Sequence, residues 1–136
     1  MTFTESIQTC FGKYATFSGR AARSEYWWFV LFVMVVTFLL EIIDIRLFGV
    51  TVVGPGSISG STGFAPFSTL FMLVTLLPGL GVAARRLHDN DRSAWWLLIA
   101  LVPVVGFIVL LVWLVGRGTP GPNRFGPDPV ASTATL

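Results

Sequence analysis

The spacing of charged residues constrains this chain more than any other feature of its sequence. No Asp, Glu, Lys or Arg occurs in residues 26–40, 47–84 or 93–116. A helix rises about 1.5 Å per residue, so about 20 apolar residues cross the 30 Å hydrocarbon core of a bilayer. Only 12% of the 136 residues are charged, whereas about a quarter are charged in a typical soluble domain. We therefore expect an integral membrane protein.

The sequence predicts an all-α membrane protein with three transmembrane helices, at about residues 26–44, 65–84 and 94–115. Glycine, proline and serine are dense in residues 47–63, which indicates a loop between the first two spans. We expect residues 1–129 to form a single membrane domain and residues 130–136 to be a disordered tail.

Pro103 and Gly106 stand near the middle of the third apolar segment. A proline inside a helix removes a hydrogen bond and can kink the chain. One continuous span is the first interpretation. The alternative is a re-entrant hairpin that folds back at these residues, with arms of about ten residues and a turn that needs protein cover.

The N-terminal residues predict an amphipathic helix at the membrane interface. Ile7, Cys10, Phe11 and Tyr14 recur at helical spacing, and Thr4 can cap the helix start. Such a helix can lie at the headgroup boundary or can pack against a loop of its own protein. Both interpretations remain open from the sequence.

The basic residues predict the orientation of the spans. Three spans with a cytoplasmic N-terminal segment would place six of the nine basic residues inside and three outside. The inner six are Lys13, Arg20, Arg23, Arg85, Arg86 and Arg92, and the outer three are Arg46, Arg117 and Arg124. We therefore expect the tail on the outer side, with Arg124 near a headgroup or near Glu41 and Asp44.

Two junctions share one pattern, in which Arg-Ser precedes an aromatic pair at the start of an apolar run. Ser24 and Ser93 are candidate helix caps. Because tryptophan prefers the membrane–water interface, the aromatic residues are predicted interfacial anchors. These are Trp27, Trp28, Trp95 and Trp96.

The candidate site is a cluster of charged residues expected at the cytoplasmic face. Its members are Arg20, Arg23, Glu25, Arg85, Arg86, His88, Asp89, Asp91 and Arg92. One interpretation is a structural polar cluster, in which arginine–acid pairs fasten the loop to the first span. The other is a site for anionic lipid headgroups or a partner protein, because arginine donates two parallel hydrogen bonds to phosphate.

Neither catalysis nor a cofactor is expected. His88 is the single histidine, and the sequence has no metal-ligand spacing. The short basic clusters beside apolar runs do not indicate nucleic-acid binding. We predict a non-enzymatic structural or regulatory protein whose partners are membrane lipids, and the arginines favour anionic ones. Small residues near Gly79 leave a homo-oligomer open, and an oligomeric channel or transporter subunit is the alternative function.

Three motifs resemble an uncharacterised bacterial inner-membrane family, domain of unknown function 805. The motifs are FSGRAARSEYWWF at 17–29, RRLHDNDRSAWW at 85–96 and GTPGPNRFGPDP at 118–129. Their order and their spread over nearly the whole chain make the resemblance specific, although the glycine-rich segment at 47–63 carries no family pattern. The resemblance implies a small, helical, multi-pass protein of the bacterial inner membrane, and it implies no activity.

Overall fold

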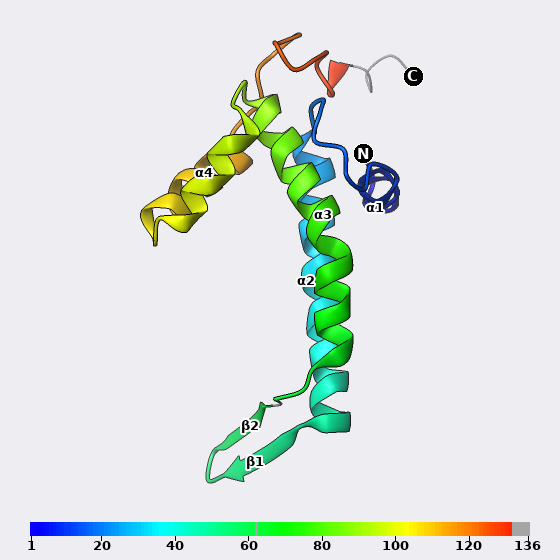
Figure 1. Cartoon of the computed structure of the whole chain (residues 1–136), viewed down its shortest axis with the longest axis vertical. Helices are drawn as coiled ribbons and strands as arrows, with labels where there is room; N and C mark the ends of the chain where they lie inside the picture. The colour runs from blue at the N-terminus through cyan, green and yellow to red at the C-terminus, as the bar shows by residue number, and fades with distance from the viewer. Residues whose placement is uncertain (62, 132–136) are drawn as a thin grey trace. The chain divides into compact units, whose positions relative to one another are not determined.

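The computed structural model describes residues 1–61 and 63–131, without the side chains of residues 50–53 and 61. The chain is mostly helical (Figure 1). Its elements, in order, are α1 (Phe3–Gly12), α2 (Arg23–Phe48), β1 (Val50–Gly54), β2 (Ser57–Ser61), α3 (Pro66–Asp89), the 3-10 helix η1 (Ala94–Leu101) and α4 (Val105–Val115).

The chain forms two compact units, and the long helices α2 and α3 contribute to both. The first unit comprises Met1–Val30 and Leu77–Leu136, and the second comprises Leu31–Leu76. The prediction of a single membrane domain stays a prediction. Of the tail predicted to be disordered, residues 132–136 lie outside the described residues.

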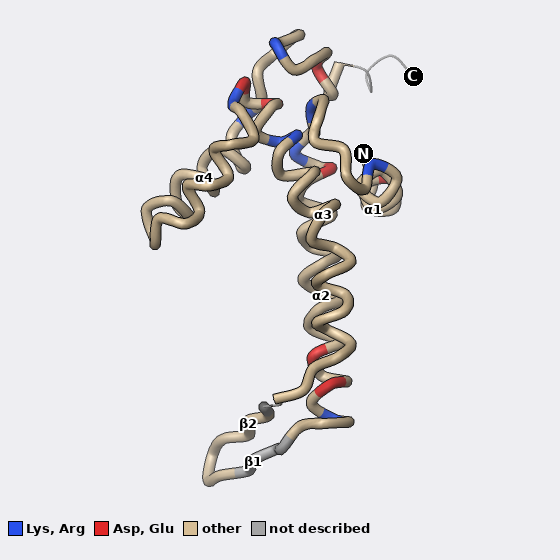
Figure 2. The backbone as a smooth tube through the Cα atoms, viewed as in Figure 1, with Lys and Arg blue, Asp and Glu red and all other residues tan. Residues whose placement is uncertain are grey.

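Helices α2 and α3, with 26 and 24 residues, are long and apolar enough to cross a membrane. Helix α2 extends beyond the expected limits of 26–44 at both ends, and α3 extends beyond the expected 65–84 at its C-terminal end. Figure 2 shows their charged residues confined to the ends, with no charge along the length between. Large apolar side chains such as Met34, Phe38 and Leu70 are more than 60% exposed in the second unit, as lipid-facing residues are. The two-helix part of the expected fold is therefore confirmed.

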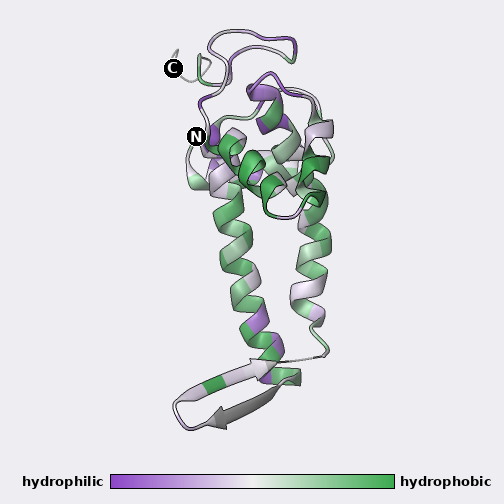
Figure 3. Cartoon of the chain, turned by 90° about the vertical axis from the view of Figure 1, so that its left-hand side faces the viewer, coloured by the Kyte–Doolittle hydropathy of each residue, from purple (hydrophilic) through white to green (hydrophobic). Residues whose placement is uncertain are grey.

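The third apolar segment is divided into η1 and α4, so the prediction of one continuous helix over 94–115 is wrong, whereas the prediction that this segment spans the membrane stays a prediction. Ser93 accepts a hydrogen bond from the Trp95 backbone N–H and begins η1, as expected of that serine. The chain turns after Leu101, and α4 begins at Val105. Proline ended the helix here because Pro103 cannot donate the hydrogen bond that continuation would need. Figure 3 shows this segment as almost uniformly hydrophobic.

The segment expected to be a glycine-rich loop contains a β-hairpin. Strands β1 and β2 are antiparallel, with Val50 opposite Ser61 and Gly54 opposite Ser57. Pro55 and Gly56 make the two-residue turn, and Gly56 takes a φ of +80° that suits glycine. The prediction of a loop missed these two strands, because the dense glycine and serine residues hid the β-branched residues of β1, which favour strand pairing.

The first unit packs around the ends of α2 and α3. Helix α1 is capped by Thr2 and Glu5 in a reciprocal pair of hydrogen bonds, so the prediction of Thr4 as the cap is wrong. Its buried face carries Ser6 and Cys10, and the Ser6 hydroxyl donates to the Ser24 carbonyl. Helix α1 therefore packs against its own chain, as one of the two interpretations predicted.

An acidic residue of α2 caps the start of α3 within the second unit. The Asp44 carboxylate accepts from the backbone N–H groups of Phe67 and Ser68, at 3.1 and 2.8 Å, and from the Ser68 hydroxyl at 2.7 Å. Asp44 is fully buried, whereas Glu41 is exposed. Free N–H groups at a helix start need such partners, so Asp44 fastens α3 to α2.

We predict that Asp44→Ala lowers the free energy of unfolding in detergent micelles by about 1–2 kcal/mol, the usual value of a helix cap. The stability of Asp44→Asn, which keeps one acceptor oxygen, should lie between that of the unmodified protein and that of Asp44→Ala. Glu41→Ala is the matched control and should change stability little. Equal stability of the Asp44→Ala and Glu41→Ala variants in denaturant titrations would contradict the assignment.

Candidate functional site

Three buried arginines form the centre of the first unit. The side chains of Arg20, Arg85 and Arg86 are at most 1% exposed. A buried charge is tolerated only when it is paired and fully hydrogen-bonded. The partners of these three guanidinium groups therefore determine how the unit is built.

Arg85 joins α3 to the start of α2 and to the segment that precedes α2. It donates to the Glu25 carboxylate at 2.7 Å and to the Thr16 carbonyl at 2.8 Å. Gly81, one turn earlier on α3, lies so close to the Thr16 carbonyl that an added Cβ would approach it to 3.2 Å. The small residue at position 81 thus serves packing within the chain.

Arg86 joins α3 to the end of α4. Its Nε donates to the Leu114 carbonyl at 3.0 Å, and an Nη group donates to the Gly116 carbonyl. The remaining Nη group contacts the Asp89 carboxylate and the Ala21 carbonyl. The last carbonyls of a helix have no partner within it, and Arg86 supplies one for α4.

Arg20 holds the segment that follows α4. Its Nε donates to Asp89 at 3.0 Å, and its Nη groups donate to the carbonyls of Thr119 and Gly121, both at 2.6 Å. The Thr119 N–H in turn donates to the Asp89 carbonyl at 2.7 Å. Gly118 passes so close to Asp89 that a Cβ there would clash with the carboxylate.

His88 belongs to the same assembly and is only 7% exposed. Its ring stacks on Phe125 with centroids 4.0 Å apart, and its Nδ1 lies 3.0 Å from the Gly19 carbonyl. Asn123 donates to the His88 carbonyl at 2.8 Å. The histidine therefore serves as a docking surface for the segment around Phe125.

The loop after α3 ends the helix with a known hydrogen-bond pattern. The Arg92 N–H donates to the Leu87 carbonyl, and the Asp91 N–H donates to the His88 carbonyl, as in a Schellman motif. Asp91 takes the left-handed position, with a φ of 54°. The guanidinium of Arg92 lies 4.1 Å from the centre of the Trp113 ring.

The predicted cluster therefore divides into two groups. The buried members are Arg20, Glu25, Arg85, Arg86, His88 and Asp89, and all of them are bound to other parts of the chain. Arg23 and Asp91 are exposed, and Arg92 is half-buried. The predicted anchors Trp28, Trp95 and Trp96 are 40%, 78% and 47% exposed, and Trp27 is half-buried.

The tail lies with this cluster, so its predicted place on the opposite side is wrong. Arg124 pairs with Asp91 at 3.2 Å rather than with Glu41 or Asp44. The prediction treated the third apolar segment as one straight helix, whereas η1 and α4 are joined by a turn and pack on one another. All three motifs consequently meet in the first unit.

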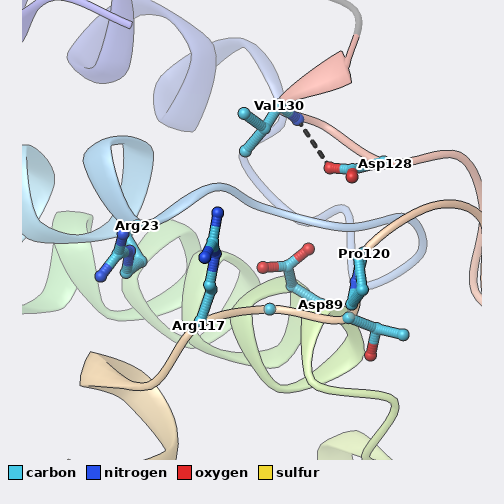
Figure 4. Close-up of a pocket in the computed structure, with 8 residues that line it drawn as sticks. Arg23, Asp89, Arg117, Pro120, Asp128 and Val130 are labelled. Atoms are coloured by element: carbon cyan, nitrogen blue, oxygen red, sulfur yellow. Dashed lines mark hydrogen bonds between the residues drawn. The ribbon is translucent and has the colours of Figure 1, made fainter.

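A pocket of about 180 Å³ opens beside the buried cluster (Figure 4). Its lining residues are Arg23, Asp89, Arg117, Gly118, Thr119, Pro120, Asp128 and Val130. Arg23 and Arg117 are exposed, and no side-chain hydrogen bond or ion pair engages either one among residues 1–61 and 63–131. The Asp89 oxygens are already occupied by Arg20 and Arg86. The pocket therefore offers two free guanidinium groups.

Asp128 is the second carboxylate of the pocket. The backbone N–H groups of Val130 and Gly121, which donate to it at 2.9 and 3.0 Å, hold the pKa of Asp128 below its usual range. Asp128 is therefore ionised at neutral pH, and its carboxylate accepts hydrogen bonds from the backbone of its own loop.

Sequence reasoning missed Arg117 and Asp128 as neighbours of Arg23. Arg117 was assigned to the opposite side of the membrane by the three-span count. The available signal was the motif at 118–129, because its glycines and prolines are typical of turns. In the structure Gly121 and Gly126 adopt positive φ.

Comparison with known proteins places the chain. The model of the family described as "Protein of unknown function (DUF805)" matches residues 14–127. The chain belongs to the DUF805 family. Two relatives from Escherichia coli K12, "Inner membrane protein YhaH" and "Inner membrane protein YhaI", are each 42% identical over 117 residues. The alignments cover 86% of this chain and 89% and 88% of the relatives.

No solved structure is a match to the chain. The DUF805 relatives carry no activity in their names, but they confirm the family that the three motifs indicated. Together with two helices long enough to cross a bilayer, they place this DUF805 member among inner-membrane proteins. Within residues 1–61 and 63–131, no group of three His, Cys, Asp or Glu side chains is arranged to hold a metal ion.

We predict that Arg20→Lys releases the segment 119–126, because a lysine cannot keep the forked contacts to two carbonyls. Each lost charge-assisted bond is worth about 1.5–3 kcal/mol. Amide hydrogen exchange in that segment should therefore accelerate by about tenfold or more. Arg46→Lys, an exposed position on the second unit, is the control and should leave this exchange unchanged.

Proposed function

We propose that this DUF805 protein is a non-enzymatic membrane component that holds the phosphate of an anionic lipid headgroup between Arg23 and Arg117. The observation that carries the proposal is the pair of exposed, unengaged guanidinium groups around one pocket. The buried arginines, which the sequence also offered for this role, are already held by carboxylates and carbonyls of the chain itself. Their function is to shape the pocket.

The position of both arginines along the chain supports a lipid rather than a soluble anion. Arg23 begins α2, immediately before the aromatic residues Tyr26, Trp27 and Trp28. Arg117 follows α4 and ends the charge-free segment 93–116. Residues that flank apolar segments in this way lie at the depth of lipid headgroups.

The start of α2 adds to the attraction for phosphate. Helix α2 begins at Arg23, so Ser24 lies inside the helix and is not its cap as predicted, and Ala22, which precedes the helix, has no polar side chain. Free N–H groups at a helix start attract anions. This supports a headgroup site only together with the two guanidinium groups.

The distribution of charge supports a cytoplasmic location for this pocket. Eight of the nine Lys and Arg residues belong to the first unit, and Arg46 alone belongs to the second. The first unit has five acidic residues, which leaves it a net charge of +3. Positive loops remain in the cytoplasm, so we place the first unit there, with the β-hairpin on the other side.

The rival channel or transporter has less support. Ion pathways usually carry ionisable groups within the spans, and none occurs in residues 26–40 or 65–84. Two long helices also cannot enclose a pore without further copies. Transport therefore stays the weaker alternative.

We predict that the double variant Arg23→Gln/Arg117→Gln binds phosphatidylglycerol about tenfold or more weakly in nanodiscs. The reason is that each charge-assisted hydrogen bond contributes about 1.5–3 kcal/mol. Native mass spectrometry would count the lipids retained. Lys13→Gln/Arg46→Gln is the matched control, because it removes the same net charge from exposed positions outside the pocket.

Two further arms identify the ligand's source. Phosphatidylcholine nanodiscs test whether the headgroup must be anionic, and added inorganic phosphate tests whether a free anion competes. Equal lipid retention by the pocket variant and its control would show that these arginines do not form the site. Complete displacement by millimolar phosphate would assign the pocket to a soluble anion instead.

A further inference from the structure

The segment formed by η1 and α4 has no role in the proposed headgroup site, yet it exposes the most apolar surface of the first unit. Leu101, Val104 and Phe107 are 80%, 70% and 66% exposed. The whole stretch from Ser93 to Gly116 carries no charge. An exposed surface of this kind in water would be strongly unfavourable and would mark an interaction site.

Its two arms have the same length, and that length is half a bilayer. Eight residues of 3-10 helix at about 2.0 Å each extend about 16 Å. Eleven residues of α-helix at about 1.5 Å each also extend about 16 Å. The hydrocarbon core is about 30 Å thick, so each arm reaches about its middle.

The arms are built to fold back on one another. Trp96 and Trp113 pack edge to face at 5.5 Å between ring centroids. Gly106 allows the closest approach, because an added Cβ would collide with the Ile99 carbonyl. This contact between η1 and α4 requires the absence of a side chain at position 106.

The turn between the arms is tight and strained. Val104 has φ 64° and ψ −63°, and the Val105 N–H donates to the Pro103 carbonyl at 2.7 Å. This is a γ-turn, which is rare for a β-branched residue. A strained turn of this kind persists only where the surrounding packing holds it. The packing between η1 and α4 therefore favours a chain reversal at Val104 over one straight helix.

The turn also satisfies much of its own backbone. The N–H groups of Val102, Gly106 and Ile108 donate to the carbonyls of Ile99, Val102 and Val104. Pro103 has no N–H group to satisfy. Internal hydrogen bonding of this kind is what a non-helical turn needs in hydrocarbon.

The feet of the hairpin are marked by charge. Arg92 and Arg117 bracket the segment, and Asn90 donates to the carbonyls of Arg86 and Trp113. Both feet therefore join the same buried polar cluster of the first unit. A transmembrane path would separate them by the full thickness of the membrane.

We propose that the η1–α4 hairpin is a re-entrant element whose apolar surface contacts the acyl chains of the cytoplasmic leaflet and does not cross the membrane. The occupant of this surface is lipid hydrocarbon. The matched arm length, the charge-free sequence and the two arginine-bearing feet support that occupant over a soluble protein. The inference is independent of whether Arg23 and Arg117 bind a headgroup.

Accessibility labelling tests the topology. Burial raises the pKa of the Cys10 thiol to about 12, so the native chain is a low-reactivity background for added cysteines. Ser18→Cys, Pro127→Cys and Ser57→Cys place thiols at exposed positions before α2, after α4 and in the β-hairpin. An impermeant maleimide should label the first two in inside-out vesicles and Ser57→Cys only in right-side-out vesicles. Labelling of Pro127→Cys together with Ser57→Cys would overturn the proposal.

Spin-label depth measurements test the occupant. Nitroxides would be attached at Leu101→Cys, at Phe38→Cys within α2 and at Trp95→Cys near a foot, in vesicles of phosphatidylglycerol and phosphatidylethanolamine. Leu101→Cys should match Phe38→Cys in high oxygen and low nickel-chelate accessibility, and Trp95→Cys should be more accessible to the chelate.

Two results would overturn lipid as the occupant. Chelate accessibility at Leu101→Cys equal to that at Trp95→Cys would place the tip outside the hydrocarbon. Dipolar broadening at Leu101→Cys that disappears on dilution with unlabelled protein would show that a second copy of the chain covers the tip.

Discussion

Hydrogen bonding of backbone carbonyls by buried guanidinium groups is the interaction on which the first unit depends. Arg20, Arg85 and Arg86 carry three positive charges, and the carboxylates that pair with them within the described residues are those of Glu25 and Asp89. The carbonyls of the preceding loop, of the end of α4 and of the tail supply the remaining acceptors. Because burial without these acceptors would be costly, the arginines impose one arrangement on segments that have little apolar core of their own.

In this arrangement, the arginines that hold the fold together differ from those that are free to bind a ligand. The buried arginines bring α2, α3 and the tail together, and the pocket forms where those segments meet. Arg23 and Arg117 remain exposed at its edge. A basic cluster found in a sequence can thus contain two kinds of arginine. An exposed arginine can bind phosphate, whereas a buried arginine already binds the chain.

Features that depend on neighbouring residues could be predicted from the sequence, whereas features that depend on contacts between distant residues could not. The two long helices, the cap at Ser93 and the family motifs depend on local spacing, and these predictions are confirmed. Two nearby threonines, Thr2 and Thr4, could each cap α1, and the structure uses Thr2. The Asp44 cap on α3 joins residues more than 20 positions apart, and no local pattern could indicate it.

The sequence by itself predicted a membrane protein, because its long charge-free runs are typical of helices that face lipid, and the inner-membrane relatives agree with that prediction. It also determined which polar segments share a family pattern. Only the tertiary structure decided that the third run folds back at Pro103 and that Arg117 stands beside Arg23. The physical reason is that hydropathy is the same for a span and for a hairpin of equal length, whereas the contacts of Gly106 with Ile99 and of Arg86 with Gly116 exist only after folding.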